Sequence, residues 1–217
     1  MTSDINPIAL ALLLGLLSLV PMLIIMTTSF LKISIVAMLL RNALGVQQIP
    51  PNIAIYSLAL ILSAYVMAPV GQTVYQALHA RPEAMMSISV FLETALQAAE
   101  PLRDFMLRNT EPGQLNFFVD TVKHLWPPEL ANHVSRRDFT VLIPAFMISE
   151  LTSAFMIGFL IYLPFVVIDL VVQSILLALG MMMMSPMTIS LPLKLLLFVM
   201  ADGWTRLLHS LVLSYAV

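Results

Sequence analysis

Long apolar stretches at both ends of the chain flank a polar middle. Residues Ile8 to Leu40 are apolar almost throughout, and a second apolar stretch covers Ile53 to Val70. As one straight helix the first stretch would be roughly 50 Å long, whereas the hydrocarbon core of a bilayer is about 30 Å thick. We therefore expect a helix that is broken or kinked near Pro21, because proline removes a backbone donor.

The C-terminal part repeats the apolar pattern with its own interruptions. Its segments are Thr140 to Leu163, then Phe165 to Met184 after Pro164, then Met187 to Met200 after a break at Ser185-Pro186, then a final helix to about Tyr215. The pattern predicts an all-α membrane protein with about four apolar helices, or five to six if the kinks divide them.

Charged residues concentrate between the apolar parts. Fourteen of the 22 charged residues lie between Gly71 and Thr140, where Leu102, Phe105 and Met106 fall at helical spacing. We divide the chain into an N-terminal apolar hairpin (1–70), a polar helical insert (71–140) and a C-terminal apolar part with a methionine loop (141–217). Arg41 near the first turn favours a cytoplasmic turn, which would place the insert on the periplasmic side.

Composition excludes several classes of function. The chain is 60% hydrophobic and only 10% charged, whereas soluble domains are typically about 25% charged. Its net charge of −2 gives no basic patch for nucleic acid. Without cysteine or a phosphate-binding, metalloprotease or serine-hydrolase motif, we expect no enzyme and no cofactor. The first six residues carry no Lys or Arg, so we expect a retained N-terminus rather than a cleaved signal.

Three ionisable residues lie in apolar surroundings: Glu150, Asp169 and Lys194. Each would cost at least about 2.5 kcal/mol at mid-bilayer without a partner. If the chain turns at Ser185, Asp169 and Lys194 would differ in depth by about 10 Å. Lys194 would then need a carboxylate from another helix or another copy of the chain. Structural pairing is favoured over a transport relay, and Lys194 could also reach the headgroups.

The segment from Gly180 to Pro186 contains four consecutive methionines, Met181, Met182, Met183 and Met184. Methionine is unbranched and adaptable, so these residues would suit a deformable collar around a conduit. A methionine-rich helix end in lipid or core is the alternative, and composition alone favours it. The insert's aromatic residues are most simply core or subunit-contact residues.

Two long motifs resemble the signatures of one family. They are Pro144 to Leu151 (PAFMISEL), continued by Ala154 to Phe159, and Pro192 to Lys194 followed by an apolar run and Asp202-Gly203-Trp204. They look like the type III secretion export-gate family, which includes flagellar FliP and the SctR or YscR-type proteins of injectisomes. Gly45 to Pro51 looks more like the injectisome branch.

The resemblance implies a multi-pass protein of the bacterial inner membrane. Five copies, with smaller S- and T-type membrane subunits, would form a helical pore of kinked hairpins that projects towards the periplasm and exports unfolded proteins. It implies a pore gasket of Met181, Met182 and Met183, extended by Met184. It also implies subunit-interface charges at Glu150, Asp169 and Lys194 and assembly aromatics at Phe105 and Phe118. An ion-coupled solute transporter and an assembly scaffold without a pore are the alternatives.

Overall fold

The computed structural model describes residues 14–15, 18–46, 48–79, 94, 96–181 and 183–216. The regular elements in those residues are all helices, as the sequence predicts. They are α2 (Val20–Thr27), α3 (Phe30–Leu44), α4 (Asn52–His79), α6 (Glu100–Arg108), α7 (Pro112–Leu125), α8 (Pro128–Ala131), α9 (Phe139–Ala178), α10 (Pro186–Met200) and α11 (Gly203–Leu213).

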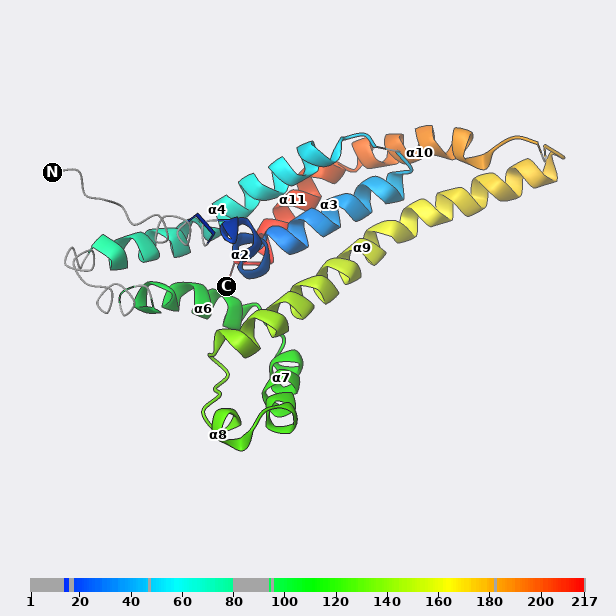
Figure 1. Ribbon diagram of the computed structural model, residues 1–217. Helices are drawn as coiled ribbons and strands as arrows, with labels where there is room; N and C mark the ends of the chain where they lie inside the picture. Colours follow the sequence, from blue (N-terminus) through cyan, green and yellow to red (C-terminus); the bar gives the residue numbers. More distant parts are fainter. Residues whose placement is uncertain are drawn as a thin grey trace.

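Helix α9 is the long helix against which α2, α3, α6, α7 and α10 pack (Figure 1). Its 40 residues correspond to a length of about 60 Å. The helices of the insert gather near its beginning, α3 packs along its middle, and α10 runs back along its far end. The expected division of this segment at Pro164 is wrong, because α9 continues through both Pro144 and Pro164. Buried residues on both sides of Pro164 anchor the helix, which offsets the backbone hydrogen bond that proline removes.

The first apolar stretch is divided, because α2 begins one residue before Pro21 and the chain bends after its end. That proline lies in the first turn of α2, where its missing N–H is tolerated. The chain bends by 81° between α2 and α3, at Thr28 and Ser29. The Thr28 hydroxyl donates to the Ile24 carbonyl, and the Ser29 hydroxyl donates to that of Ser63 in α4. Such side-chain bonds satisfy polar groups at the break and bend the chain there. Residues 1–13, where this stretch begins, lie outside the described part.

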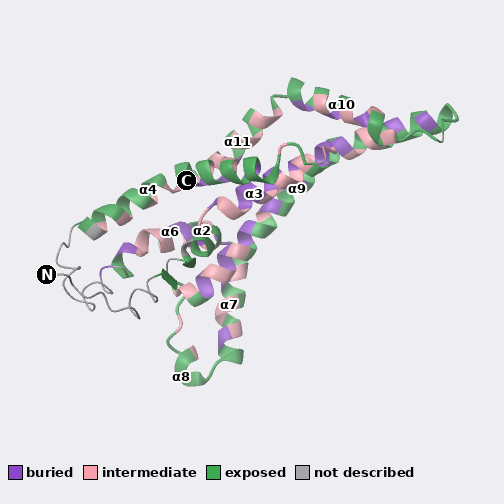
Figure 2. Ribbon diagram, turned by 45° about the horizontal axis from the view of Figure 1, so that its top comes forward, coloured by how far each residue is buried: buried purple, intermediate pink, exposed green. Residues whose placement is uncertain are grey.

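Three groups of buried apolar side chains hold the helices together. The largest joins α6 and α7 to the beginning of α9 through Phe105, Met106, Leu142 and Phe146. The other two join α3 to the middle of α9 and to α10 and α11. Figure 2 shows buried positions where α3 crosses α9, whereas α4 and the far end of the α9–α10 hairpin are mostly exposed.

Close packing of α3 on α9 depends on small residues. Ala154 is fully buried, and a Cβ atom at Gly158 would come within 2.2 Å of the Leu39 Cδ1 atom. The spacing Ala154-x-x-x-Gly158 places two small residues one turn apart, which permits such an approach.

Among the described residues, two helices are long and apolar enough to cross a membrane, α4 and α9. The bent pairs α2–α3 and α10–α11 pass the same test if each pair counts as one span, which gives up to four. Many large apolar side chains of α4, α9 and α10 are exposed on the single chain. These surfaces fit contact with lipid or with neighbouring chains.

Candidate functional site

Two ion pairs lie along α9, one of them enclosed and the other partly exposed. Glu150 and Asp169 are both on this helix, nineteen positions apart, which corresponds to about 28 Å along its axis. Each carboxylate binds a lysine from a different helix, Lys32 of α3 and Lys194 of α10. Each pair therefore fixes one helix against α9 at its own level.

The first pair is almost completely enclosed. The Lys32 ammonium lies 3.0 Å from a Glu150 carboxylate oxygen, and their side chains are 6% and 2% exposed. The Tyr215 hydroxyl donates a hydrogen bond to the other carboxylate oxygen of Glu150. The Lys32 nitrogen also lies 4.0 Å from the centre of the Tyr215 ring. The three side chains satisfy one another, which is the condition under which charges are tolerated in an apolar interior.

The second pair joins α10 to α9 and contradicts the expectation for Lys194. Its ammonium lies 2.6 Å from the Asp169 carboxylate and donates a second hydrogen bond to the Ala43 carbonyl at 3.3 Å. The Lys194 side chain is 7% exposed, whereas that of Asp169 is 43% exposed. Lys194 therefore needs no carboxylate from another copy of the chain, and it does not reach out to headgroups.

The expectation failed because it treated the methionine segment as helix. Helix α9 ends at Ala178 and α10 begins at Pro186, so Asp169 lies nine residues before one end and Lys194 eight residues after the other. At about 1.5 Å per residue the two are level to within about 2 Å. The seven-residue connection 179–185 sets this register.

The methionine loop forms the tip of the α9–α10 hairpin (Figure 1). Gly180 has a left-handed φ of 72°. The Met181 amide donates to the Leu176 carbonyl and the Gly180 amide donates to the Leu177 carbonyl. These are the two hydrogen bonds of a Schellman C-cap, which needs a residue tolerant of positive φ. The helix therefore stops at this glycine, before the break at Ser185-Pro186 that the sequence predicts.

The methionine side chains of the loop are exposed on the single chain. Met183 is fully exposed, and Met181 and Met184 are 41% and 45% exposed. Met182 lies outside the described residues. The tip is far from the insert, at the opposite end of α9 (Figure 1). The single chain thus presents adaptable apolar side chains at the end of a long hairpin. Their role as a gasket stays a prediction.

The two aromatic residues predicted to support assembly occupy different environments. Phe105 is 4% exposed and packs between the rings of Phe146 and Tyr215, with centroid distances of 6.0 and 5.8 Å. Phe118 is partly buried and contacts Phe117, which is 60% exposed. Within the chain Phe105 is thus a core residue that joins the insert to the C-terminal residues. A role of either residue in assembly stays a prediction.

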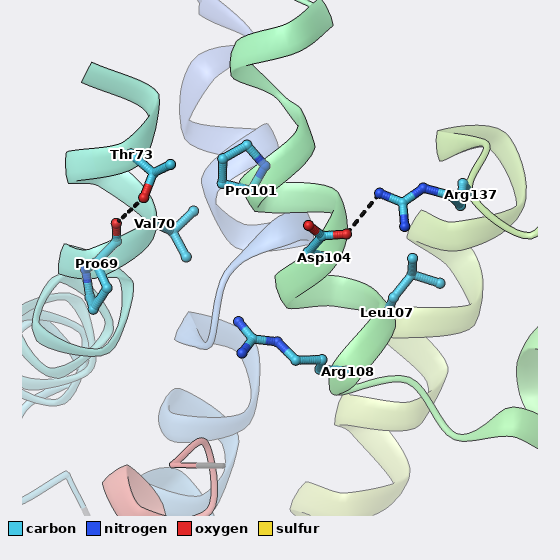
Figure 3. Close-up of a pocket in the computed structure, with 8 residues that line it drawn as sticks. All are labelled: Pro69, Val70, Thr73, Pro101, Asp104, Leu107, Arg108 and Arg137. Atoms are coloured by element: carbon cyan, nitrogen blue, oxygen red, sulfur yellow. Dashed lines mark hydrogen bonds and ion pairs between the residues drawn. The ribbon is translucent and has the colours of Figure 1, made fainter. Parts of the chain in front are cut away.

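A pocket of about 590 Å³ lies between α4 and α6, and Figure 3 shows its lining. Arg137 binds Asp104 at 2.7 Å and Glu100 at 2.7 Å. These hydrogen bonds hold the pKa of the Arg137 guanidinium above its usual value. Arg108 extends from α6 towards α4. The described residues contain no group of three or more His, Asp or Glu side chains placed to hold a metal ion.

Sequence reasoning missed two members of the first ion-pair cluster. Lys32 gave a signal, because a lysine in an apolar stretch is unlikely to face lipid. The choice of Glu150 as its partner depends on how α3 packs against α9. Tyr215 gave no signal, because its partner Glu150 lies 65 residues earlier in the chain.

Comparison with known proteins agrees with the motifs. A model described as the FliP family matches residues 13–211. The chain is 54% identical over 210 residues to "Yop proteins translocation protein R" of Yersinia pestis, covering 97% of both chains. It is 48% identical over 214 residues to "Harpin secretion protein HrcR" of Erwinia amylovora, covering 99% of both. It is 47% identical over 212 residues to "Virulence protein YscR" of Salmonella typhimurium, covering 97% of this chain and 98% of that one. The chain therefore belongs to the FliP family, among its YscR- and HrcR-type members from type III secretion systems.

Proposed function

We propose that this chain is a core subunit of the export gate in the bacterial inner membrane, where it lines the pore through which a type III secretion system exports unfolded proteins. Several copies, five by resemblance to the family, would assemble with the smaller S- and T-type membrane subunits. The gate would project towards the periplasmic side. In this proposal the chain is a passive conduit, and partners or the proton gradient supply the energy.

The observation that carries the proposal is the methionine loop at the tip of the α9–α10 hairpin. A Schellman cap ends α9 at Gly180, and exposed methionines follow at once. When several hairpin tips converge on one axis, unbranched thioether side chains can pack into a seal that excludes water and ions. Their freedom of rotation would let the same side chains close around varied segments of an unfolded polypeptide.

The ion pairs give the hairpin the stiffness that such a seal needs. Lys194 and Asp169 bind α10 to α9 between the tip and the body of the protein. Lys32 and Glu150 bind α3 to α9 about 28 Å further along. Methionines on a hairpin braced in this way would return to one position after a substrate has passed. Both pairs form within one chain, so we infer that they shape the subunit before they support contacts between subunits.

The arrangement of charges gives less support to an ion-coupled transporter. A relay would need titratable groups within hydrogen-bond reach of one another, directly or through water. Here the carboxylates stand about 28 Å apart along α9. Each is bound to its own lysine. Assembly of a pore uses the same residues without a proton path.

The decisive experiment replaces the methionines of the tip in the assembled gate. Changing Met181, Met182 and Met183 together to Ala should leave assembly intact and raise resting ion conductance across the membrane. Met200→Ala is the matched control, because this methionine of α10 is 78% exposed and lies away from the tip. Unchanged conductance in the triple variant would refute the seal. Crosslinking of a stalled substrate to a photoreactive residue at Met183 would separate a pore lining from a scaffold.

A further inference from the structure

An apolar pocket of about 440 Å³ opens where α3, α9, α10 and α11 meet. This volume falls within the range of about 300–1,000 Å³ typical of ligand sites. Its walls are mainly aliphatic and aromatic side chains, including Leu160, Ile161, Phe165, Leu197 and Leu207. Arg206 and Ser210 of α11 supply its polar side chains. The pocket therefore offers an apolar chamber with one cation.

The cation lacks an ion-pair partner among the described residues. Arg206 is exposed, and its guanidinium makes no ion pair or hydrogen bond with them. Residues 186–213 contain one carboxylate, Asp202, which also forms no ion pair with Arg206. An arginine in a helix of membrane class needs an anion close by, because an unpaired charge next to hydrocarbon is costly. The residues that the structure describes do not provide that anion.

The position of Arg206 fits the level of lipid headgroups. Asp202, Trp204, Arg206 and His209 cluster within eight positions of the bent α10–α11 pair, and apolar residues dominate before and after them. The pair bends by 59° at this place. Tryptophan concentrates at membrane–water interfaces, and arginine near a helix end extends its charged group to them. No side chain caps the beginning of α11, so its first amides can also face an anion.

We propose that this pocket binds one anionic phospholipid. The phosphate would be held by the Arg206 guanidinium, which can offer two parallel N–H donors. One acyl chain would fill the apolar chamber between α9 and α11. A bound lipid would satisfy the cation and cover the apolar walls at once, and it would brace α11 against α3 and α9. An apolar helix of a neighbouring chain would cover the walls but leave the arginine without a partner.

The test uses the purified full-length chain in detergent and native mass spectrometry with phosphatidylglycerol. The wild-type chain should retain one lipid tightly, and phosphatidylglycerol should bind more strongly than zwitterionic phosphatidylcholine. Arg206→Gln should weaken retention about tenfold, because it removes charge-assisted bonds to phosphate. Leu160→Trp should also weaken binding, because the indole would occupy the chamber. Leu160 is 60% exposed, so the larger side chain has room to be accommodated.

The matched control is Arg136→Gln in the insert. Arg136 is an exposed arginine bonded to Asn116, away from this pocket, and its loss should leave lipid retention unchanged. Equal affinity for phosphatidylglycerol in the wild-type chain and Arg206→Gln would overturn the proposal. So would a Leu160→Trp variant that binds lipid normally but no longer co-purifies with its neighbouring chains, a result that assigns the pocket to a protein contact. Helix content measured by circular dichroism should be the same in all variants.

Discussion

The buried pair of Lys32 and Glu150 allows a quantitative test of how α3 is held against α9. Replacing one partner leaves the other charge enclosed, since both side chains are at most 6% exposed. Loss of one partner of a buried pair costs about 3–5 kcal/mol. We therefore expect Lys32→Met and Glu150→Met each to lower the free energy of unfolding by about this amount.

The double variant should be more stable than either single variant. Two methionines of similar length replace the pair with apolar contacts, which is often neutral for stability. One cost remains, because the Tyr215 hydroxyl then has no acceptor, and a buried unsatisfied donor costs about 1–3 kcal/mol. The double-mutant cycle should therefore give a coupling energy of at least about 3 kcal/mol.

Unfolding in mixed micelles with increasing sodium dodecyl sulfate, followed by circular dichroism, would measure these energies. Lys123 and Asp120 serve as the control pair, because they lie 2.8 Å apart on the surface of α7 with side chains that are 63% and 66% exposed. Their coupling should be much smaller, since water screens exposed charges. If the effects of Lys32→Met and Glu150→Met simply add, the reasoning about an enclosed, mutually dependent pair is wrong.

Three further comparisons test other contacts. Asp169→Asn should destabilise the chain more than Lys194→Met in the same unfolding assay, because the first leaves a 7% exposed ammonium without its carboxylate and the second leaves a 43% exposed carboxylate. Gly203→Ala should lower stability by about 1–3 kcal/mol in that assay, because the new Cβ would lie 2.1 Å from the Phe198 ring. Tyr215→Phe should lower the thermal midpoint, because it removes the hydroxyl that donates to a buried carboxylate.

The glycine and tyrosine changes have matched controls, and the Asp169 and Lys194 changes are compared with each other. Gly71→Ala lies inside α4, where nothing stands within 4 Å of the new Cβ, so it should raise stability by roughly 0.5–1 kcal/mol. Tyr65→Phe changes a ring that is 71% exposed and should leave the thermal midpoint unchanged. A larger loss from Lys194→Met than from Asp169→Asn would contradict the burial argument. A Gly203→Ala variant as stable as wild type would show that the Phe198 ring can move away.

Several features follow from local rules that the sequence displays. The apolar stretches predict membrane-class helices, because hydrocarbon requires every backbone group to be satisfied within the helix. Ser185-Pro186 predicts the start of α10, because a first-turn proline acts within one turn. The need of each buried charge for a partner is also a local property, set by the cost of leaving it alone in an apolar environment.

Other features were decided by packing between distant segments. Pro164 within α9 suggests a break, yet contacts on both sides of it outweigh one lost hydrogen bond. The 81° bend of the first stretch lies at Thr28 and Ser29, where Ser63 of α4 provides a hydroxyl partner. The pattern and spacing within a segment do not predict which distant hydroxyl group packs beside it.

The choice of ion-pair partners shows the same division. The sequence alone determined that Glu150, Asp169 and Lys194 must be paired or solvated, because the free energy of an isolated charge depends mainly on its immediate surroundings. Tertiary structure decided that Lys32 and Tyr215 complete the first cluster and that Asp169 faces Lys194. Those pairings depend on the length of a non-helical connection and on the packing of α3 against α9. Neither the length of that connection nor the packing of α3 can be predicted from the spacing of charged residues along the chain.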